Sequence, residues 1–135
     1  MAEFAVKMGD GRSIPLVGLG TYLEDADQAK SSVMAALKAG YRHVDTAAGY
    51  SNETGVAAGI LESGVPRSDI FICTKVYPGN PAWGQQAKPY EAVIEDCHAS
   101  LANLQVRLPH NDPPPQQTAL RHSVRRGPWP TVCAW

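Results

Sequence analysis

Hydrophobic positions repeat at two spacings along the first hundred residues, and the two spacings alternate. Short apolar or alternating runs predict a β-hairpin and then three strands, at residues 4–8 with 13–15, 16–20, 41–46 and 70–76. Apolar residues three or four apart predict three helices with inner faces formed by Ala26, Ala29, Val33, Ala36 and Leu37, by Val56, Ile60 and Leu61, and by Tyr90, Val93, Ile94, Cys97, Leu101 and Leu104. The pattern is a hairpin followed by three βα units.

Residues with strong preferences for helix ends mark the limits of these helices. Side-chain caps or a proline are expected to begin them: Asp25 or Asp27, Ser51 or Asn52, and Pro89. Gly40 and Gly64 are expected to end the first two, because glycine readily adopts a positive φ. Strands that alternate with helices form a parallel sheet with right-handed crossovers. The predicted class is therefore α/β, either a doubly wound sheet or part of a (β/α)8 barrel.

The composition changes sharply after Gln105. Residues 1–105 hold 8 basic and 12 acidic side chains, a balance of -4, whereas residues 106–135 hold four arginines and one aspartate, a balance of +3. Six of the 11 prolines also fall in those last 30 residues. A proline-rich stretch without strand or helix periodicity is typical of low structural order. We expect a folded domain over 1–105 and a low-order Pro/Arg-rich tail over 106–135.

The composition of the whole chain limits the classes of partner and compartment. The 135 residues carry a net charge of -1, which gives no reason to expect a nucleic acid or an anionic membrane as partner. No apolar run approaches the length of a membrane span, and the first residues do not resemble a secretory signal. Three cysteines without a CxxC pair fit a reducing compartment, so the expected location is the cytoplasm. The adjacent Cys97 and His98 point to different helix faces, so no metal site is expected.

Three polar side chains follow predicted strands, at the ends where α/β enzymes keep their chemistry. Asp45 ends the second strand, Lys75 lies near the end of the third, and Tyr50 lies in the loop after the second. A carboxylate can orient a lysine, and the ammonium beside a phenol stabilises the phenolate, which makes the phenol a better proton donor to a carbonyl oxygen. The same residues also fit a structural interpretation, in which Asp45 caps a helix, Lys75 is a solvated strand end and Tyr50 is half-buried.

The sequence motifs around these residues favour the acid–base interpretation. Residues 40–47 (GYRHVDTA), 50–53 (YSNE), 14–21 (IPLVGLGT) and the strand end Thr74-Lys75 resemble, in order, the motifs of the aldo-keto reductase family. The resemblance covers residues from about 4 to 105. It implies an N-terminal hairpin that plugs a (β/α)8 barrel, and NADPH-dependent reduction of aldehydes and ketones, small molecules that would be the partners of the site.

The resemblance assigns roles to individual residues. Tyr50 would be the general acid, Lys75 the cation that makes it more acidic, and Asp45 the partner that fixes Lys75. Gly20, Thr21 and Tyr22 match a segment at the mouth of the barrel near the nicotinamide, and Asp45 is expected near the nicotinamide ribose. These four residues are the expected NADPH-binding set, although the choice between NADPH and NADH stays open.

The resemblance ends where the fourth βα unit should begin. The family continues with a strand that supplies a catalytic histidine, whereas this chain reads VRLPHNDPPP from Val106. His110 follows a proline and precedes a proline run, which a strand does not accommodate. We expect an incomplete barrel with open sheet edges, from a changed reading frame or a retained intron. Such a chain would be weakly active or inactive. The alternative is a non-catalytic fragment that associates with itself or with a full-length homologue.

Overall fold

A computed structural model describes residues 4–9, 11–79, 84–106 and 133–134. The elements in chain order are β1 (Ala5–Lys7), β2 (Ser13–Pro15), β3 (Leu19–Gly20), α1 (Ala26–Lys38), β4 (His43–Asp45), the 3-10 turn η1 (Ala48–Tyr50), α2 (Glu53–Ser63), the 3-10 turn η2 (Arg67–Asp69), β5 (Phe71–Lys75), α3 (Tyr90–Asn103) and β6 (Cys133–Ala134). Strands and helices alternate from β3 to α3, so the predicted order of a hairpin and three βα units is confirmed for the described residues.

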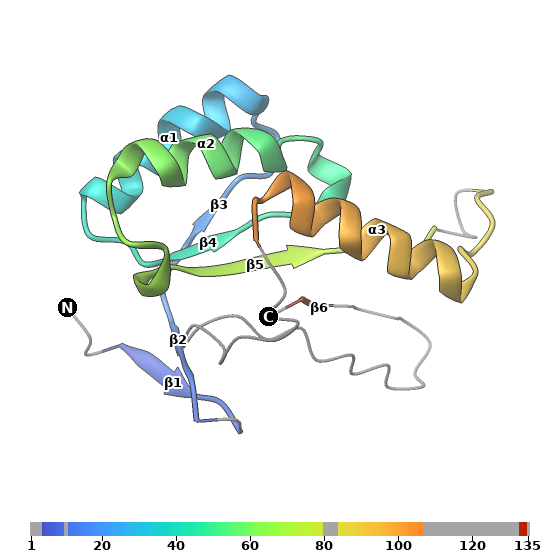
Figure 1. Ribbon diagram of the computed structural model, residues 1–135, viewed down its shortest axis with the longest axis horizontal. Coiled ribbons are helices and arrows are strands. Elements are labelled where there is room, and N and C mark those ends of the chain that lie inside the picture. Colours follow the sequence, from blue (N-terminus) through green and yellow to red (C-terminus); the bar gives the residue numbers. More distant parts are fainter. Residues whose placement is uncertain (1–3, 10, 80–83, 107–132, 135) are drawn as a thin grey trace.

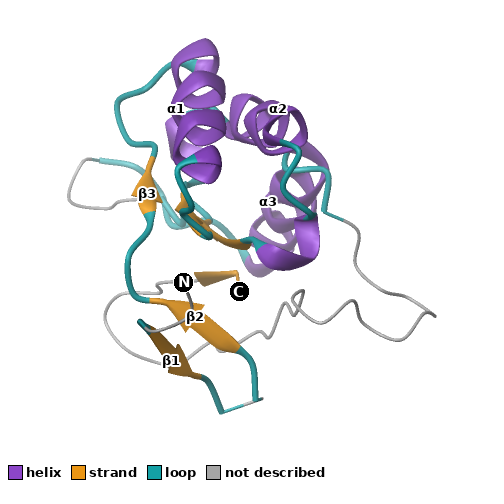
Figure 2. Ribbon diagram, turned by 90° about the vertical axis from the view of Figure 1, so that its left-hand side faces the viewer, coloured by secondary structure: helices purple, strands orange, loops and turns teal. Residues whose placement is uncertain are grey.

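The strands form a hairpin and one larger sheet. β1 and β2 pair antiparallel, as predicted, while β3, β4 and β5 are parallel neighbours in that order. All three helices lie on the same face of this sheet, and the hairpin lies on the other side (Figures 1 and 2). A doubly wound sheet carries helices on both faces, whereas the wall of a (β/α)8 barrel carries them on its outer face alone. The arrangement of the described helices therefore favours the barrel alternative.

The helix ends follow from local chemistry, with one exception. Asp25 and Gln28 form a reciprocal capping box at the start of α1, with N–H···O distances of 2.8 and 3.0 Å. Gly40 and Gly64, with φ of 101° and 72°, follow α1 and α2 as predicted. Asn52 does occupy the residue before α2, but its side chain makes no capping hydrogen bond. Of the two expected caps, Ser51 and Asn52, it is Asn52 that marks the start of α2, but the expected side-chain cap does not form because the amide bonds elsewhere.

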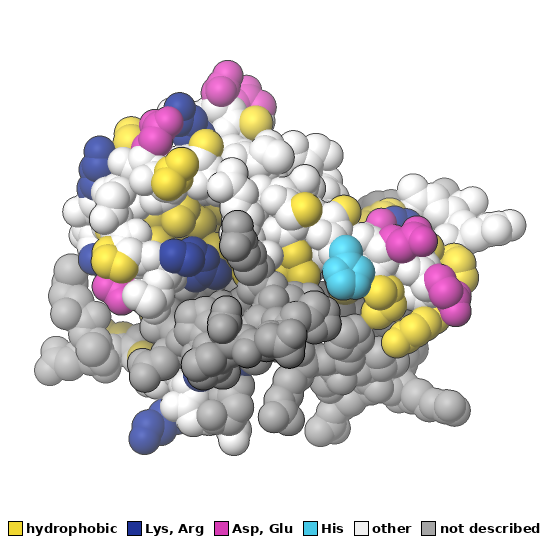
Figure 3. Space-filling view, viewed as in Figure 1, with side chains coloured by type: hydrophobic (Ala, Val, Ile, Leu, Met, Phe, Trp, Pro, Cys, Tyr) yellow, Lys and Arg dark blue, Asp and Glu magenta, His cyan; other side chains and the backbone are white. Residues whose placement is uncertain are grey.

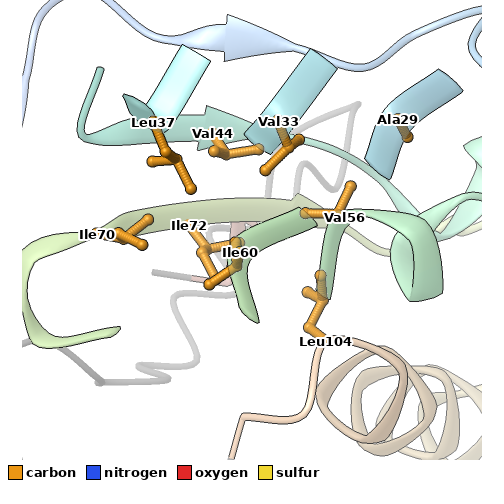
Figure 4. Packing of buried hydrophobic residues seen from close by; sticks show 9 residues of the cluster. All are labelled: Ala29, Val33, Leu37, Val44, Val56, Ile60, Ile70, Ile72 and Leu104. Atoms are coloured by element: carbon orange, nitrogen blue, oxygen red, sulfur yellow. The ribbon is translucent and has the colours of Figure 1, made fainter. Parts of the chain in front are cut away.

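The apolar core lies between the helices and the sheet. Its buried members come from α1, β4, α2, the strand β5 with the residue before it, and the end of α3, and Figure 4 shows them facing one another: Ala29, Val33, Leu37, Val44, Val56, Ile60, Ile70, Ile72 and Leu104. Two glycines bring α1 and α2 together. A Cβ atom on Gly55 would lie 2.0 Å from the carbonyl oxygen of Ala26, and one on Gly59 would lie 2.5 Å from that of Lys30. The two helix backbones are therefore in direct contact.

Several predicted inner positions lie at the surface. Leu61 is 73% exposed, because it follows buried Ile60 by about 100° around α2. Tyr90 is 65% exposed in the first turn of α3, where the helix extends beyond the core. The predicted strand 16–20 is reduced to its last two residues, and Leu16 and Val17 are exposed in the link from the hairpin.

Most of the predicted low-order tail, 106–135, lies outside the described residues. Val106 packs against the core, and its N–H donates to the carbonyl oxygen of Leu101 at 2.8 Å. β6 pairs antiparallel with β5, with Ala134 opposite Thr74 and Cys133 opposite Lys75. No strand was predicted in this stretch, because two residues are too few to show a period. In the described part of the chain, no helix has the length and apolarity needed to cross a membrane.

Candidate active site

Asp45 and Lys75 meet where two neighbouring parallel strands end. Asp45 is the last residue of β4 and Lys75 is the last residue of β5. The Lys75 ammonium donates to Oδ2 of Asp45 at 2.6 Å and to the carbonyl oxygen of Thr46 at 3.0 Å. Both side chains keep more than a third of their surface exposed. The pair is therefore held at the edge of the sheet, within reach of solvent and of a small molecule.

The charge state of Lys75 follows from two opposing effects. Partial burial alone would lower the pKa of Lys75, but the hydrogen bond and the charge of Asp45 act the other way, and the net result is a pKa raised above the ordinary 10.5. Tyr50 and Cys73 add smaller contributions in the same direction. Lys75 is a fixed cation at neutral pH, as a group that stabilises a neighbouring phenolate must be.

Tyr50 completes the set from the end of η1. The Lys75 nitrogen lies 5.5 Å from the centre of the Tyr50 ring, within the range of a cation–π contact. The Tyr50 ring also meets that of Tyr22, with 5.0 Å between ring centres and a 56° angle between planes. The fold thus brings together all three residues that the sequence analysis selected for acid–base chemistry, which come from two strand ends and one loop.

The four candidate cofactor residues occupy two different surroundings. Gly20 pairs with Asp45 across the sheet, and a Cβ atom placed on Gly20 would meet nothing within 4 Å. Tyr22 is 66% exposed. Thr21, by contrast, is fully buried, and its hydroxyl donates to that of Thr46 at 2.9 Å. Gly20, Tyr22 and Asp45 are therefore open to solvent, as a cofactor contact requires, while the Thr21 side chain is buried and bonded inside the fold.

Two buried polar residues with no predicted site role, Thr46 and Asn52, connect the segments that carry the site residues. Thr46 and Asn52 are fully buried, and Asn52 bonds both Thr46 and the loop after β3. Asn52 was expected only as a helix cap. The signal that could have found the network is that polar residues follow two neighbouring strands, Thr21 after β3 and Thr46 after β4, where hydroxyls must find partners once they are buried.

No described histidine stands beside the three residues. His43 begins β4, where its ring meets Phe71 edge-on and Nδ1 lies 3.0 Å from the carbonyl oxygen of Pro15. His98 is exposed on α3. His110 lies outside the described residues. Among those residues, His, Cys, Asp and Glu side chains nowhere form a group of three that could hold a metal ion.

βα units with their helices on one face of the sheet are typical of barrel enzymes, which keep their chemistry at the carboxyl ends of the strands, where Asp45 and Lys75 lie with Tyr50 in the loop beside them. The family model of the aldo/keto reductase family matches residues 16–109. The chain belongs to the aldo/keto reductase family.

Relatives show how much of the family's length is represented. The chain is 43% identical over 99 residues to an aldo-keto reductase of Mycolicibacterium smegmatis. The aligned residues make up 73% of this chain and 36% of that protein. It is also 43% identical over 102 residues to the glyoxal reductase of Bacillus subtilis, an alignment that covers 75% of this chain and 34% of that protein. The crystal structure of the Bombyx mori aldo-keto reductase in complex with NADP superimposes with a TM-score of 0.64 at 32% identity, covering 76% and 34%. The chain spans about a third of the length of the relatives it matches.

Proposed function

We propose that Asp45, Lys75 and Tyr50 are the acid–base part of a carbonyl-reducing site, and that the reaction is the reduction of an aldehyde or ketone to an alcohol with NADPH. The observation that carries the proposal is the Lys75 ammonium, which bonds Asp45 at 2.6 Å and lies 5.5 Å from the Tyr50 ring centre. The membership in an oxidoreductase family and the NADP complex of the Bombyx mori relative support it.

Each side chain has a distinct part in this chemistry. The Tyr50 hydroxyl donates a proton to the carbonyl oxygen of the substrate as negative charge develops there. Lys75 stabilises the phenolate that remains, because a cation beside a phenol favours its ionised form. Asp45 holds Lys75 in place. NADPH, when bound, supplies the hydride that goes to the carbonyl carbon.

The residues around the group fit one end of NADPH. A Cβ atom placed on Gly20 would meet nothing within 4 Å, which leaves room for a ligand beside the backbone, and the partly exposed carboxylate of Asp45 can accept a hydrogen bond from a ribose hydroxyl. Tyr22 borders the same space with an aromatic wall. Gly20, Tyr22 and Asp45 would hold the nicotinamide and its ribose. We further propose, as expected from the sequence, that this chain alone is weakly active or inactive.

Steady-state NADPH oxidation, followed at its nicotinamide absorbance with glyoxal or a simple aldehyde, tests this function. We expect kcat/KM below about 10⁴ M⁻¹s⁻¹, the lower limit for typical enzymes. Any turnover should be lost in Tyr50→Phe and kept in Tyr41→Phe, since Tyr41 lies at the opposite end of the β4 segment. A kcat/KM in the usual enzymatic range would refute the weak activity, and turnover unchanged by Tyr50→Phe would refute the acid–base role.

A second candidate function is association, either with another copy of the chain or with a full-length homologue. The observation in its favour is exposed apolar surface: Phe4, Leu16 and Val17 are 60–73% exposed around the hairpin, and hydrophobic side chains also reach the surface over α3 (Figure 3). Sedimentation velocity over a concentration series tests this function. A single monomeric species at all concentrations would contradict self-association, and co-sedimentation with a full-length homologue tests the second arm.

A further inference from the structure

Asn52 is a fully buried polar residue that the acid–base chemistry does not use. Its amide nitrogen donates to two backbone carbonyl oxygens in the loop after β3, those of Thr21 at 2.7 Å and Glu24 at 2.9 Å. Carbonyl oxygens can only accept, so these two bonds fix which side of the amide faces the loop. The Asn52 side chain therefore has one defined orientation.

The oxygen of the same amide points to a chain of buried hydroxyls. The Thr21 hydroxyl donates to that of Thr46 at 2.9 Å, and the Thr46 hydroxyl donates to Oδ1 of Asn52 at 3.2 Å. The Thr21 hydroxyl also lies 3.5 Å from Oδ1 of Asn52. One side chain thus joins the loop after β3, the end of β4 and the start of α2.

Each of the three joined segments carries a part of the proposed site. Tyr22 follows Thr21, and its ring contacts that of Tyr50. The carbonyl oxygen of Thr46 accepts from Lys75. Tyr50 itself lies two residues before Asn52, with Ser51 between them at a φ of 57°, a left-handed conformation that a non-glycine residue keeps only when its surroundings hold it.

The position of Asn52 in the chain makes this bridging role specific. Asparagine is a favoured capping residue before a helix, because its side chain can accept from the exposed N–H groups of the first turn. Here it occupies that position at α2 without a capping hydrogen bond. The Asn52 side chain forms hydrogen bonds with residues that follow β3 and β4, and not with the first turn of its own helix.

We propose that Asn52 is a positioning residue, whose amide sets the Tyr50 ring against Tyr22 and Lys75. This inference rests on the proposed function, since the placement matters for catalysis only if Tyr50 and Lys75 are its acid–base pair. Without the amide, the loop after β3 and the Tyr50 turn lose the connection between them, and the Tyr22–Tyr50 contact is lost with it.

Glu53, the next residue, provides the matched control. It is also buried, at 3% exposure, and its carboxylate accepts from the Thr74 hydroxyl at 2.7 Å and from the Asn103 amide at 3.1 Å. Thr74 precedes Lys75 on β5, and successive strand side chains point to opposite faces. The bonds of Glu53 therefore tie α2 to β5 and α3 and not to the loop after β3, so Glu53→Gln should lower stability without moving Tyr50.

The test is the nuclear Overhauser effect between the Tyr22 and Tyr50 rings, measured with selectively labelled tyrosine, together with urea unfolding of each variant. We expect the cross-peak to be lost in Asn52→Ala and retained in Glu53→Gln. Because Asn52→Ala can fail to fold, a milder pair accompanies it. Thr21→Val removes one hydroxyl of the network with little change of shape and should weaken the cross-peak, whereas Thr21→Ser keeps the hydroxyl and should preserve it.

Wild-type cross-peak intensity in folded Asn52→Ala, or in Thr21→Val, would overturn the inference. The measurement needs neither cofactor nor turnover. Its outcome is thus separate from the Tyr50→Phe activity comparison, which decides the proposed function. Where wild-type turnover is measurable, we further expect Asn52→Ala to lower kcat by up to about 100-fold with a smaller change in KM, since misplacing a reacting group by about 1 Å has effects of this size.

Discussion

Replacing Gly55 with alanine tests whether direct backbone contact between α1 and α2 stabilises the fold. An added Cβ atom would lie 2.0 Å from the carbonyl oxygen of Ala26, 2.7 Å from its carbonyl carbon and 2.8 Å from its Cα. All three are backbone atoms, so no side chain can turn away to relieve the clash. Ordinary contact needs roughly 3.5 Å, so the helices must separate by about 1.5 Å at this point.

Two opposing terms set the expected size of the effect. Alanine is intrinsically favoured over glycine inside a helix by about 1 kcal/mol, which would stabilise the variant. Forcing extra volume into a packed contact typically costs about 1–3 kcal/mol and occasionally more, and separating the helices also loosens the core to which both contribute buried side chains. The clash is severe, so we take the upper end of the cost and expect net destabilisation by about 2 kcal/mol.

Urea unfolding followed by circular dichroism measures the change in the free energy of unfolding. In thermal unfolding, each kcal/mol of destabilisation should lower Tm by roughly 4–8 °C in a domain of this size. Gly59→Ala should cost less, because its nearest backbone contact is 2.5 Å. Gly9→Ala is the control, since a Cβ atom there meets nothing within 4 Å. A Gly55→Ala variant as stable as the wild type, or more stable, would show that helix propensity outweighs the contact and would refute the reasoning.

Other properties of the chain can be checked in the same way. The pKa of Lys75 is raised in the folded state, so the stability from its pairing with Asp45 is present in full below the ordinary lysine pKa and disappears as pH rises through the folded value. The difference in unfolding free energy between the wild type and Asp45→Asn should therefore shrink over that pH range. A difference that grows with pH would contradict the pairing. Burial raises the pKa of the Cys97 thiol, with a further contribution from Asp96, so iodoacetamide should label Cys97 slowly in the folded chain and quickly in urea; equal rates would show that α3 is not docked. Leu61→Gln should change the unfolding free energy by less than about 0.5 kcal/mol, because this side chain is 73% exposed, and a larger loss would mean that Leu61 packs inside.

The order of elements could be predicted from the sequence because each signal was local. Asp25, Gly40 and Gly64 mark helix ends through their own backbone and side-chain chemistry, without reference to the rest of the fold. Exposure of Leu61 and Tyr90 could not be predicted in the same way. Apolar spacing identifies a helix face, but which part of that face is covered depends on where the neighbouring elements end.

The site was predictable for a different reason. Asp45 and Lys75 end strands that pair in parallel, so their ends had to meet once the strand order was right. Tyr50 was a candidate because it lies in the loop after the same strand as Asp45, but its spacing alone left a structural interpretation open, and the family resemblance was needed to favour the acid–base one. The hydrogen bonds of Asn52 were missed because its partners lie 6 to 31 residues away in the chain, and local preference indicated a helix cap.

The most direct test of the proposed site is the titration of Lys75, followed by NMR of its side chain in the wild type and in Asp45→Asn. We expect the pKa of Lys75 to lie above the ordinary 10.5 in the wild type and to fall in Asp45→Asn. Asp69→Asn, in the turn before β5, should leave it unchanged. A Lys75 that titrates at or below the ordinary value, or that is insensitive to Asp45→Asn, would contradict the claim that this chain assembles an acid–base site.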